Sequence, residues 1–380
     1  MTFNRVGPAS LMCLAVLFLS GCGGKGSGWG GTITIENGVT VVRNPSEPLY
    51  PGDVVRFEEE LSIGAAEGDE MMLFSSIHGF DVDSGGNIFV LNRTEPQLRV
   101  FAPDRTFVRT IGRKGQGPGE MDNPRLIQIT PGEEEIMVYD PVVRRMDFYA
   151  RDGTFLRNSS IAATISGPIV NIRRDVTGCS LAVSLSMPEG AQLCRYGEDF
   201  TPLETLVQMP RDDPNKATIL GPSPAFALMP EGWAWAVTDR YAIVITDREG
   251  KPVRRIEREY DPVPIPSAYK DEQRQGRLRR LIDMGFKIDF PDTYPPIRDI
   301  FADPEGRIYV STYERCEEGE DCWYMDAFDK EGRYLTRFPL RFSLDRGMLW
   351  KGGKLTRIEA DEEGYQMIKR YSVRWDFPDR

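Results

Sequence analysis

Short runs of apolar and alternating residues recur along the chain, and clusters of Gly, Pro, Asp, Asn and Ser separate them. The clearest group lies between Ile77 and Gly112. Its four runs are Gly79–Asp83, Asn87–Asn92, Leu98–Phe101 and Phe107–Ile111. Turn clusters stand at Ser84-Gly85-Gly86 and Pro103-Asp104-Arg105, and a glycine-rich loop follows from Gly112 to Glu120. Runs of this length with tight turns predict one antiparallel sheet of four strands.

This four-stranded unit repeats along the chain. The predicted third strands end at Phe101, Tyr149, Tyr196 and Ile245, which are 48, 47 and 49 residues apart. A four-stranded unit with a period of about 45–50 residues is typical of a β-propeller. The pattern therefore predicts an all-β fold, a six-bladed β-propeller of four-stranded antiparallel blades, over residues 53–376. The predicted blades are Ile77–Gly112, Arg125–Arg157, Ile169–Val207, Ala225–Glu257, Ile297–Phe338 and Gly347–Val373.

The sixth predicted blade lacks a strand, and the N-terminal part of the chain offers one. Val54–Gly64 matches the fourth strand of blade one, yet no inner strands precede it. Pairing this segment with the last blade would close the ring and cover both open sheet edges, which otherwise promote aggregation. We therefore expect the N-terminal strand to complete blade six.

One long insertion interrupts the period. Ile245 and Phe328 are 83 residues apart, which places extra residues in Glu259–Tyr294, between blades four and five. Within it, Pro266–Gly285 has apolar residues at helical spacing and predicts a surface helix. Its four arginines, Arg274, Arg277, Arg279 and Arg280, are mixed with acidic residues, which favours a solvated face over a nucleic-acid patch.

The first residues indicate a targeting segment. Leu11–Leu19 is an apolar run too short to span a bilayer, and small residues follow it. The end of this segment, Leu19-Ser20-Gly21-Cys22, resembles a bacterial lipobox. We expect a lipoprotein signal peptide over residues 1–21. A lipid on Cys22 would then anchor the protein to a membrane, which is its predicted partner. The alternative is a plain signal peptide. Gly23, in place of the Asp typical of inner-membrane lipoproteins, favours the outer membrane, facing the periplasm or the exterior.

Residues 22–52 are expected to connect the anchor to the propeller. Gly23–Gly31 is glycine-rich and predicts a flexible tether. Thr32–Val42 alternates and turns at Asn37-Gly38, a dipeptide that favours a type I′ turn, so we expect a small satellite hairpin ahead of the propeller.

The chain is acidic. Its formal net charge is −11, and removal of Arg5 with the signal peptide makes it −12. This charge argues against nucleic acid as a partner and against electrostatic binding to anionic lipid.

Four of the six cysteines form two local pairs within the predicted propeller. Cys179 and Cys194 flank one hairpin turn, and Cys316 and Cys322 bracket the acidic tip Glu317–Asp321. Both pairs could close disulfides in an oxidising compartment. A four-cysteine metal site is the alternative, but neither pair has CxxC spacing and the two pairs lie in different repeats.

The motif residues of blade one resemble an NHL-type repeat. They are Asp83–Val90, Arg99–Phe101, Phe107–Gly112 and Gly115–Glu120, and Asp303–Val310 repeats the first part. The chain from Val54 to Val373 is similar to the six-bladed β-propeller lipoproteins of environmental bacteria. This resemblance implies the fold but not one activity, because relatives include scaffolds for protein or RNA, sugar-lactone hydrolases and a zinc lyase.

Propellers bind ligands at the axial channel, near the start of the innermost strands. Aligning the repeats on their turn residues places His78, Arg125 and Arg298 at equivalent positions in blades one, two and five. These potential cations could attract a small anionic ligand at the axial mouth, together with Asn171 and Asp299 at a similar depth. The alternative is that each arginine pairs with a neighbouring carboxylate such as Asp299.

Candidate catalytic chemistry is sparse. His78 is the only histidine, which excludes a three-histidine zinc site, and nothing in the sequence links it to a nucleophile. Asp83, Asp175 and Asp303 precede turns, where aspartate caps backbone N–H groups, so they do not require calcium; Asp81 belongs to the same set of acids. We predict a binding or scaffold module for a protein or small molecule, with no catalytic residue, metal ligand or cofactor. The alternative is a metal-dependent lactonase-like hydrolase or lyase that uses axial carboxylates and calcium.

Overall fold

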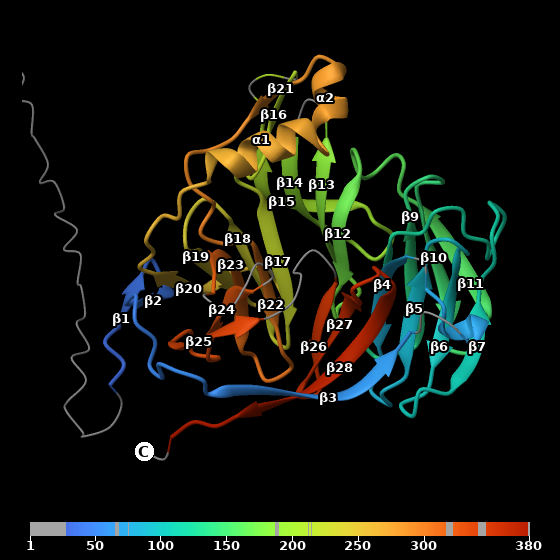
Figure 1. Ribbon diagram of the computed structural model, residues 1–380, viewed down its shortest axis with the longest axis horizontal. Coiled ribbons are helices and arrows are strands. Elements are labelled where there is room, and N and C mark those ends of the chain that lie inside the picture. Colours follow the sequence, from blue (N-terminus) through green and yellow to red (C-terminus); the bar gives the residue numbers. More distant parts are fainter. Residues whose placement is uncertain are drawn as a thin grey trace, which may run out of the picture.

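The computed structural model describes residues 28–64, 68–74, 76–186, 190–211, 213, 215–316, 322–340 and 347–378. The chain forms an all-β, six-bladed β-propeller of mostly four-stranded antiparallel blades, which confirms the predicted fold. Figure 1 shows the blades arranged in a ring around a centre, with the N-terminal β3 (Val55–Ile63) beside the C-terminal β28 (Gln366–Trp375).

Blades one to five run from the innermost strand outward in chain order, whereas the outer strand of blade six comes from the start of the chain. Blade one is β4 (Ile77–Val82), β5 (Ile88–Asn92), β6 (Gln97–Phe101) and β7 (Phe107–Ile111). Blade two is β8 (Leu126–Ile129), β9 (Glu135–Asp140), β10 (Arg145–Ala150) and β11 (Phe155–Ser160). Blade three is β12 (Ile169–Arg174), β13 (Ser180–Ser186), β14 (Gly190–Tyr196) and β15 (Pro202–Met209).

The second half of the ring follows the same order. Blade four contains β17 (Pro224–Met229), β18 (Gly232–Val237), β19 (Ala242–Thr246) and β20 (Pro252–Arg258). Blade five is β22 (Asp299–Ala302), β23 (Ile308–Arg315), β24 (Trp323–Phe328) and β25 (Tyr334–Leu340). Blade six is β26 (Met348–Lys351), β27 (Lys354–Ala360), β28 and β3.

The ring closes through the N-terminal strand, as predicted. β3 pairs antiparallel with β28 from Ile63 opposite Ile368 to Val55 opposite Trp375. Leu61 and Ile63 are buried in a core cluster that blade six shares with blade one. The outermost strand of the last blade therefore comes from the start of the chain and hides an edge that would otherwise stay open.

The N-terminal hairpin forms, but it is not a satellite. β1 (Thr32–Glu36) and β2 (Val39–Asn44) pair around Asn37 and Gly38, whose φ angles of 51° and 82° fit the predicted turn. However, β2 also pairs in parallel with β20, so blade four becomes a six-stranded sheet. The physical reason is burial: β20 offers an unpaired edge there, and Val41 and Val42 are fully buried against it.

The insertion holds two short helices instead of the single predicted helix. α1 (Ser267–Gln275) ends at Gly276, and α2 (Arg279–Asp283) starts after Leu278, which is buried. The helix breaks at Gly276, whose φ of −92° and ψ of −116° lie outside the helical region. The insertion also contributes β21 (Lys287–Asp289), which pairs in parallel with β16 (Lys216–Thr218) ahead of blade four. Among the described residues, a single 3₁₀ turn, η1 (Glu70–Met72), completes the helical segments.

No helix in the described part of the chain is long and apolar enough to cross a membrane. The predicted signal peptide and lipidated Cys22 lie outside the described residues.

Candidate functional site

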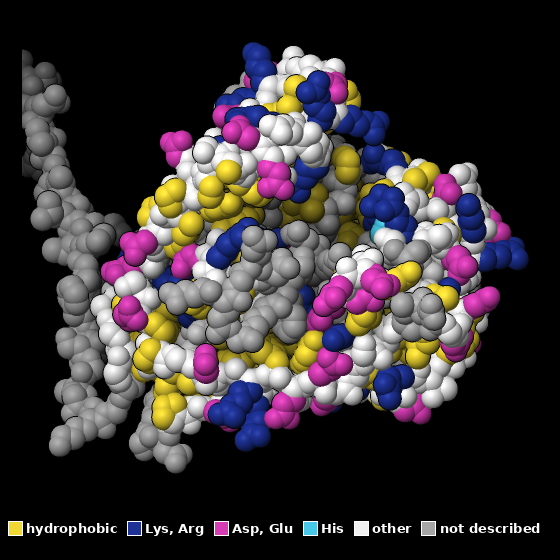
Figure 2. All heavy atoms as spheres, viewed as in Figure 1, with side chains coloured by type: hydrophobic (Ala, Val, Ile, Leu, Met, Phe, Trp, Pro, Cys, Tyr) yellow, Lys and Arg dark blue, Asp and Glu magenta, His cyan; other side chains and the backbone are white. Residues whose placement is uncertain are grey.

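The centre of the ring contains a cavity of about 640 Å³. It is lined by the innermost strands of all six blades, β4, β8, β12, β17, β22 and β26. A cleft of this size is typical of a small-molecule site. The face shown in Figure 2 carries basic and acidic side chains that are interspersed, so no field of one sign dominates that rim.

Polar side chains from blades one, two, three and five converge on the cavity. Those from the innermost strands of these blades are His78, Asp81, Gln128, Asn171, Arg173 and Asp299. Four further charged side chains line the cavity but have partners elsewhere, namely Asp175 with Thr177, Arg248 with Glu231, Asp303 with Arg307 and Lys351 with Glu133. Strand alternation explains why Asp81 and Arg173 face the cavity. The residues directly before them, Phe80 and Ile172, are buried in the cores between blades. Gln128 is itself occupied, since its amide exchanges hydrogen bonds with the backbone of Arg174 at 2.6 and 2.8 Å.

Arg173 is the cation at the centre of this wall. Its Nη1 donates to the carbonyl oxygens of Ile127 at 3.2 Å and Ile172 at 3.4 Å. Burial lowers the pKa of the guanidinium, while Asp81 and Asp299 oppose that shift. Among the described residues, no ion pair within 4 Å joins Arg173 to either carboxylate, and its Nε and Nη2 have no partner. Arg173 therefore keeps donors for a ligand.

The two carboxylates differ in how they are held. Both oxygens of Asp81 accept backbone N–H groups, from Val82 and Ile129, at 2.7 Å each. Burial raises the pKa of Asp81, and the Arg173 charge counters the shift. Burial likewise raises the pKa of Asp299 to about 6. Asp299 accepts one backbone N–H, from Ile300 at 2.9 Å on Oδ1, so Oδ2 is uncommitted among the described residues.

Two innermost strands contribute most of the apolar side chains of the lining. β17 of blade four contributes Phe226, Ala227, Leu228 and Met229, and β26 of blade six contributes Met348 and Leu349. The apolar strand of blade four lies between the blade that carries Arg173 and the blade that carries Asp299. The cavity thus combines a few polar groups with an apolar wall.

The structure brings together three of the five residues predicted for the axial mouth. His78, Asn171 and Asp299 line the cavity, whereas Arg125 and Arg298 do not. Arg125 is exposed, and Arg298 lies over the rings of Tyr313 and Trp323 at 5.4 and 5.5 Å. The sequence did contain a signal for Arg173. Alternation within Ile169–Arg173 places Asn171 and Arg173 on one face of the innermost strand and the apolar Ile172 on the other.

His78 does not act as the expected cation. Its Nδ1 lies 2.6 Å from the carbonyl oxygen of Pro124, so this nitrogen carries the proton and donates it. Burial lowers the pKa of the imidazole, and the charges of Arg125 and Arg93 lower it further. His78 is therefore neutral at pH 7, and its buried Nε2 has no hydrogen-bond partner among the described residues.

The turn aspartates cap turns, as the sequence predicts. Asp83 accepts the backbone N–H of Asn87 at 2.8 Å, Asp175 that of Thr177 at 2.8 Å, and Asp303 that of Arg307 at 2.8 Å. Within the described ranges, no group of three or more His, Cys, Asp or Glu side chains could hold a metal ion. The guanidinium of Arg173 interacts electrostatically with both Asp81 and Asp299.

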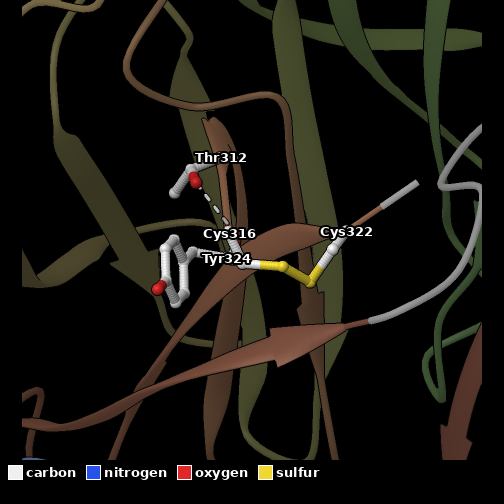
Figure 3. The surroundings of a disulfide bond; sticks show 4 residues. All are labelled: Thr312, Cys316, Cys322 and Tyr324. Carbon is white, nitrogen blue, oxygen red and sulfur yellow. Dashed lines mark hydrogen bonds between the residues drawn. A yellow bond between two sulfur atoms is a disulfide. The ribbon is translucent and has the colours of Figure 1, made fainter. Parts of the chain in front are cut away.

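One of the two predicted disulfides is present. Figure 3 shows the bond between Cys316 and Cys322, whose Cα atoms are 5.3 Å apart, next to the hydrogen bond from Thr312 to the carbonyl oxygen of Tyr324. This bond ties the end of β23 to the start of β24, and it confirms the prediction for this pair.

The other predicted disulfide is wrong, because Cys179 and Cys194 are free thiols. β13 and β14 pair with Ala182 opposite Cys194 and Ser180 opposite Tyr196, so Cys179 and Cys194 belong to opposite faces of the sheet. Cys194 contacts Thr205 at 3.6 Å, whereas Cys179 contacts Arg195 at 3.8 Å. Closeness in the sequence could not reveal this difference of face.

Comparison with known proteins supports the fold and leaves the ligand open. A model of the family DUF5128, described as a 6-bladed beta-propeller, matches residues 67–167. A solved structure from Bacteroides fragilis, of a protein described as exported, is 14% identical with a TM-score of 0.56, covering 88% of this chain and 99% of its own. A DUF4221 protein from Bacteroides vulgatus is 10% identical with a TM-score of 0.55, covering 85% and 99%. No curated protein matches the sequence.

The raised pKa of Asp299 predicts that this residue lowers the stability of the fold at neutral pH, and its replacement tests this prediction. A carboxyl group with a raised folded pKa binds more protons in the folded state, so stability falls as pH rises from the unfolded value of about 4 to the folded value of about 6. Asp299→Asn should therefore stabilise the protein at pH 7.5 by up to about 3 kcal/mol, and by almost nothing at pH 3.5. The charges of Arg298 and Arg173 lower the pKa of this group but do not cancel the effect of burial.

Urea unfolding at both pH values would measure the difference. The exposed Asp283→Asn on α2 serves as the matched control. Equal effects of Asp299→Asn at the two pH values would contradict the raised pKa.

Proposed function

We propose that this protein is a binding module of the cell envelope that holds a small organic molecule in its axial cavity. The observation that carries this proposal is the convergence of Arg173, Asn171 and Asp299, each with uncommitted polar atoms, on a cavity of about 640 Å³ with an apolar wall. The cost of keeping Asp299 charged supports a binding role, because groups held at a cost in stability are common at functional sites.

Two observations support a location outside the cytoplasm. The disulfide between Cys316 and Cys322 is of a kind that persists in oxidising compartments. The lipobox-like sequence that ends at Cys22 would place the chain on a membrane, and the structural relative from Bacteroides fragilis is described as exported. We infer a lipid-anchored protein, on the outer membrane, that presents its propeller to the periplasm or the exterior.

Filling the cavity tests the binding role. Gly79 lies on its wall in an ordinary backbone conformation, and a Cβ there would meet Ile127 Cγ2 at 3.4 Å, a normal contact. Gly79→Trp should therefore place a large side chain at the cavity wall, whereas Gly79→Ala makes the same backbone change with a single methyl group. The probes are hexanoate, hexylamine and the tripeptide Ala-Leu-Ala with free termini.

At a hundredfold excess over its Kd, a probe that binds should stabilise the native protein by about 3 kcal/mol, measured as a shift in Tm. We expect this shift for the native protein and for Gly79→Ala, and its loss for Gly79→Trp. A panel that shifts none of the proteins, or a shift that survives Gly79→Trp, would contradict the axial site.

A further inference from the structure

The charges of the cavity are arranged in an order around the ring. Arg173 comes from blade three, the apolar strand β17 from blade four, and Asp299 from blade five. Phe226, Leu228 and Met229 of β17 line the cavity between the strands that carry Arg173 and Asp299. The wall offers a cation, an apolar stretch and an anion in succession.

Arg173 and Asp299 both have polar atoms that are available to a ligand. Arg173 has Nε and Nη2 free of partners among the described residues, and Asn171, two positions earlier on the same face of β12, has a side chain with no hydrogen bond there either. Asp299 has one uncommitted oxygen. Arg173 and Asp299 are close enough to influence each other electrostatically, yet they form no ion pair within 4 Å. Each therefore has capacity for a partner that the protein does not supply.

The net charge of the cavity further restricts which class of ligand fits it. The charged residues that line the cavity sum to one negative charge when all are ionised; they are Asp81, Asp175, Asp299, Asp303, Arg173, Arg248 and Lys351. Adding a simple anion would increase that excess, and a simple cation would leave the Arg173 donors without an acceptor. Asp81 is no substitute at the anionic end, because both of its oxygens are engaged by backbone N–H groups.

We propose that the axial cavity binds a small zwitterion whose carboxylate and ammonium groups are separated by an apolar segment. Resting on the proposed binding role of the cavity, this inference assigns the carboxylate to Arg173 and Asn171, the apolar segment to β17, and the ammonium group to Asp299. Short peptides with free termini and ω-amino acids share this chemistry. The cavity volume of about 640 Å³ accommodates a peptide of two or three residues.

The assignment is tested by blocking one terminus of the peptide at a time and by replacing Asp299 or Arg173 in the protein. Isothermal titration of the full-length protein would compare Ala-Leu-Ala with its N-acetyl form, which lacks the cation, and its C-terminal amide, which lacks the anion. Each cap should weaken binding to the native protein about 10- to 100-fold, because each removes the partner of a charged group. Binding of 6-aminohexanoate would distinguish an ω-amino acid site from a peptide site.

Asp299→Asn should abolish the preference for a free amino terminus, and Arg173→Gln should abolish the preference for a free carboxyl terminus. Asp299→Asn should bind the free and acetylated peptides with equal affinity and still prefer the free carboxylate over the amide. Arg173→Gln should show the opposite pattern, and the exposed Asp283→Asn should behave as the native protein. This crossed result is one that mere damage to the fold would not produce.

Two results would overturn the inference in distinguishable ways. If either cap leaves the native affinity unchanged while Gly79→Trp still abolishes binding, the cavity binds a ligand but not a zwitterion. If neither the peptides, hexanoate, hexylamine nor 6-aminohexanoate binds, the binding role fails together with the zwitterion.

Discussion

Replacing residues 54–64 by a Gly-Ser linker of equal length should abolish cooperative unfolding of the propeller. β3 forms the outer strand of blade six through its pairing with β28, and its Leu61 and Ile63 are buried in the cluster shared with blade one. Without it, blade six keeps three strands and an open edge, and the buried Ile368 of β28 loses its cover. Thermal unfolding followed by circular dichroism should show a broad transition or aggregation in place of one sharp step.

The same strand provides its own control. Arg56 and Glu58 are exposed, so Arg56→Ser with Glu58→Ser should leave the transition sharp and its midpoint nearly unchanged. A sharp native-like transition in the linker variant would show that β3 does not close the ring.

Asp326→Ala should destabilise the protein by about 3–5 kcal/mol, the typical cost of removing one partner from a buried charge network. Asp326 is fully buried on β24 and joins blades four and five. From blade four, Tyr241 donates to it at 2.6 Å and Arg258 at 3.2 Å. From β25, Tyr334 donates at 2.7 Å and Arg337 Nε at 2.9 Å. Its loss leaves two arginines and two hydroxyl groups without their shared acceptor.

Urea unfolding at neutral pH measures this effect, with two matched variants. Asp326→Asn keeps the shape and loses the charge, so it should fall between the alanine variant and the native protein. Asp283→Ala removes an exposed carboxylate that pairs with Arg279 on α2, and its effect should stay within about 0.5 kcal/mol. Equal effects at Asp326 and Asp283 would mean that the buried network contributes nothing specific.

The Asp326 network and the β3–β28 pairing both stabilise the propeller that holds the cavity residues in place. Arg173, β17 and Asp299 belong to three different blades, and their mutual positions depend on how those blades pack. The Asp326 network fixes blade five against blade four, and β3 fixes blade six against the rest of the ring. Damage at either joint should therefore weaken binding in the cavity as well as lower stability.

Local pattern in the sequence was enough to predict most of the architecture. The four runs of blade one, the period near 48 residues and the unmatched segment Val54–Gly64 lead to six blades and to closure by the N-terminal strand. These features succeed because alternation and turn chemistry act over a few residues and repeat. The turn-capping roles of Asp83, Asp175 and Asp303 follow for the same reason, since each carboxylate bonds a backbone N–H within four residues.

Only the tertiary structure decided which residues meet across the ring. Closeness in sequence suggested a bond between Cys179 and Cys194, but strand register places them on opposite faces. Alignment of repeats suggested Arg125 and Arg298, but the cavity holds Arg173, which lies 92 residues from Asp81 and 126 from Asp299. The hairpin around Asn37 was predictable, whereas its docking on β20 was not. The faces of Cys179 and Cys194 depend on the register of one hairpin, which the spacing of two cysteines does not give. The cavity lining and the docking of the hairpin depend on packing between segments far apart in the chain, and local pattern carries no information about the partner that packing selects.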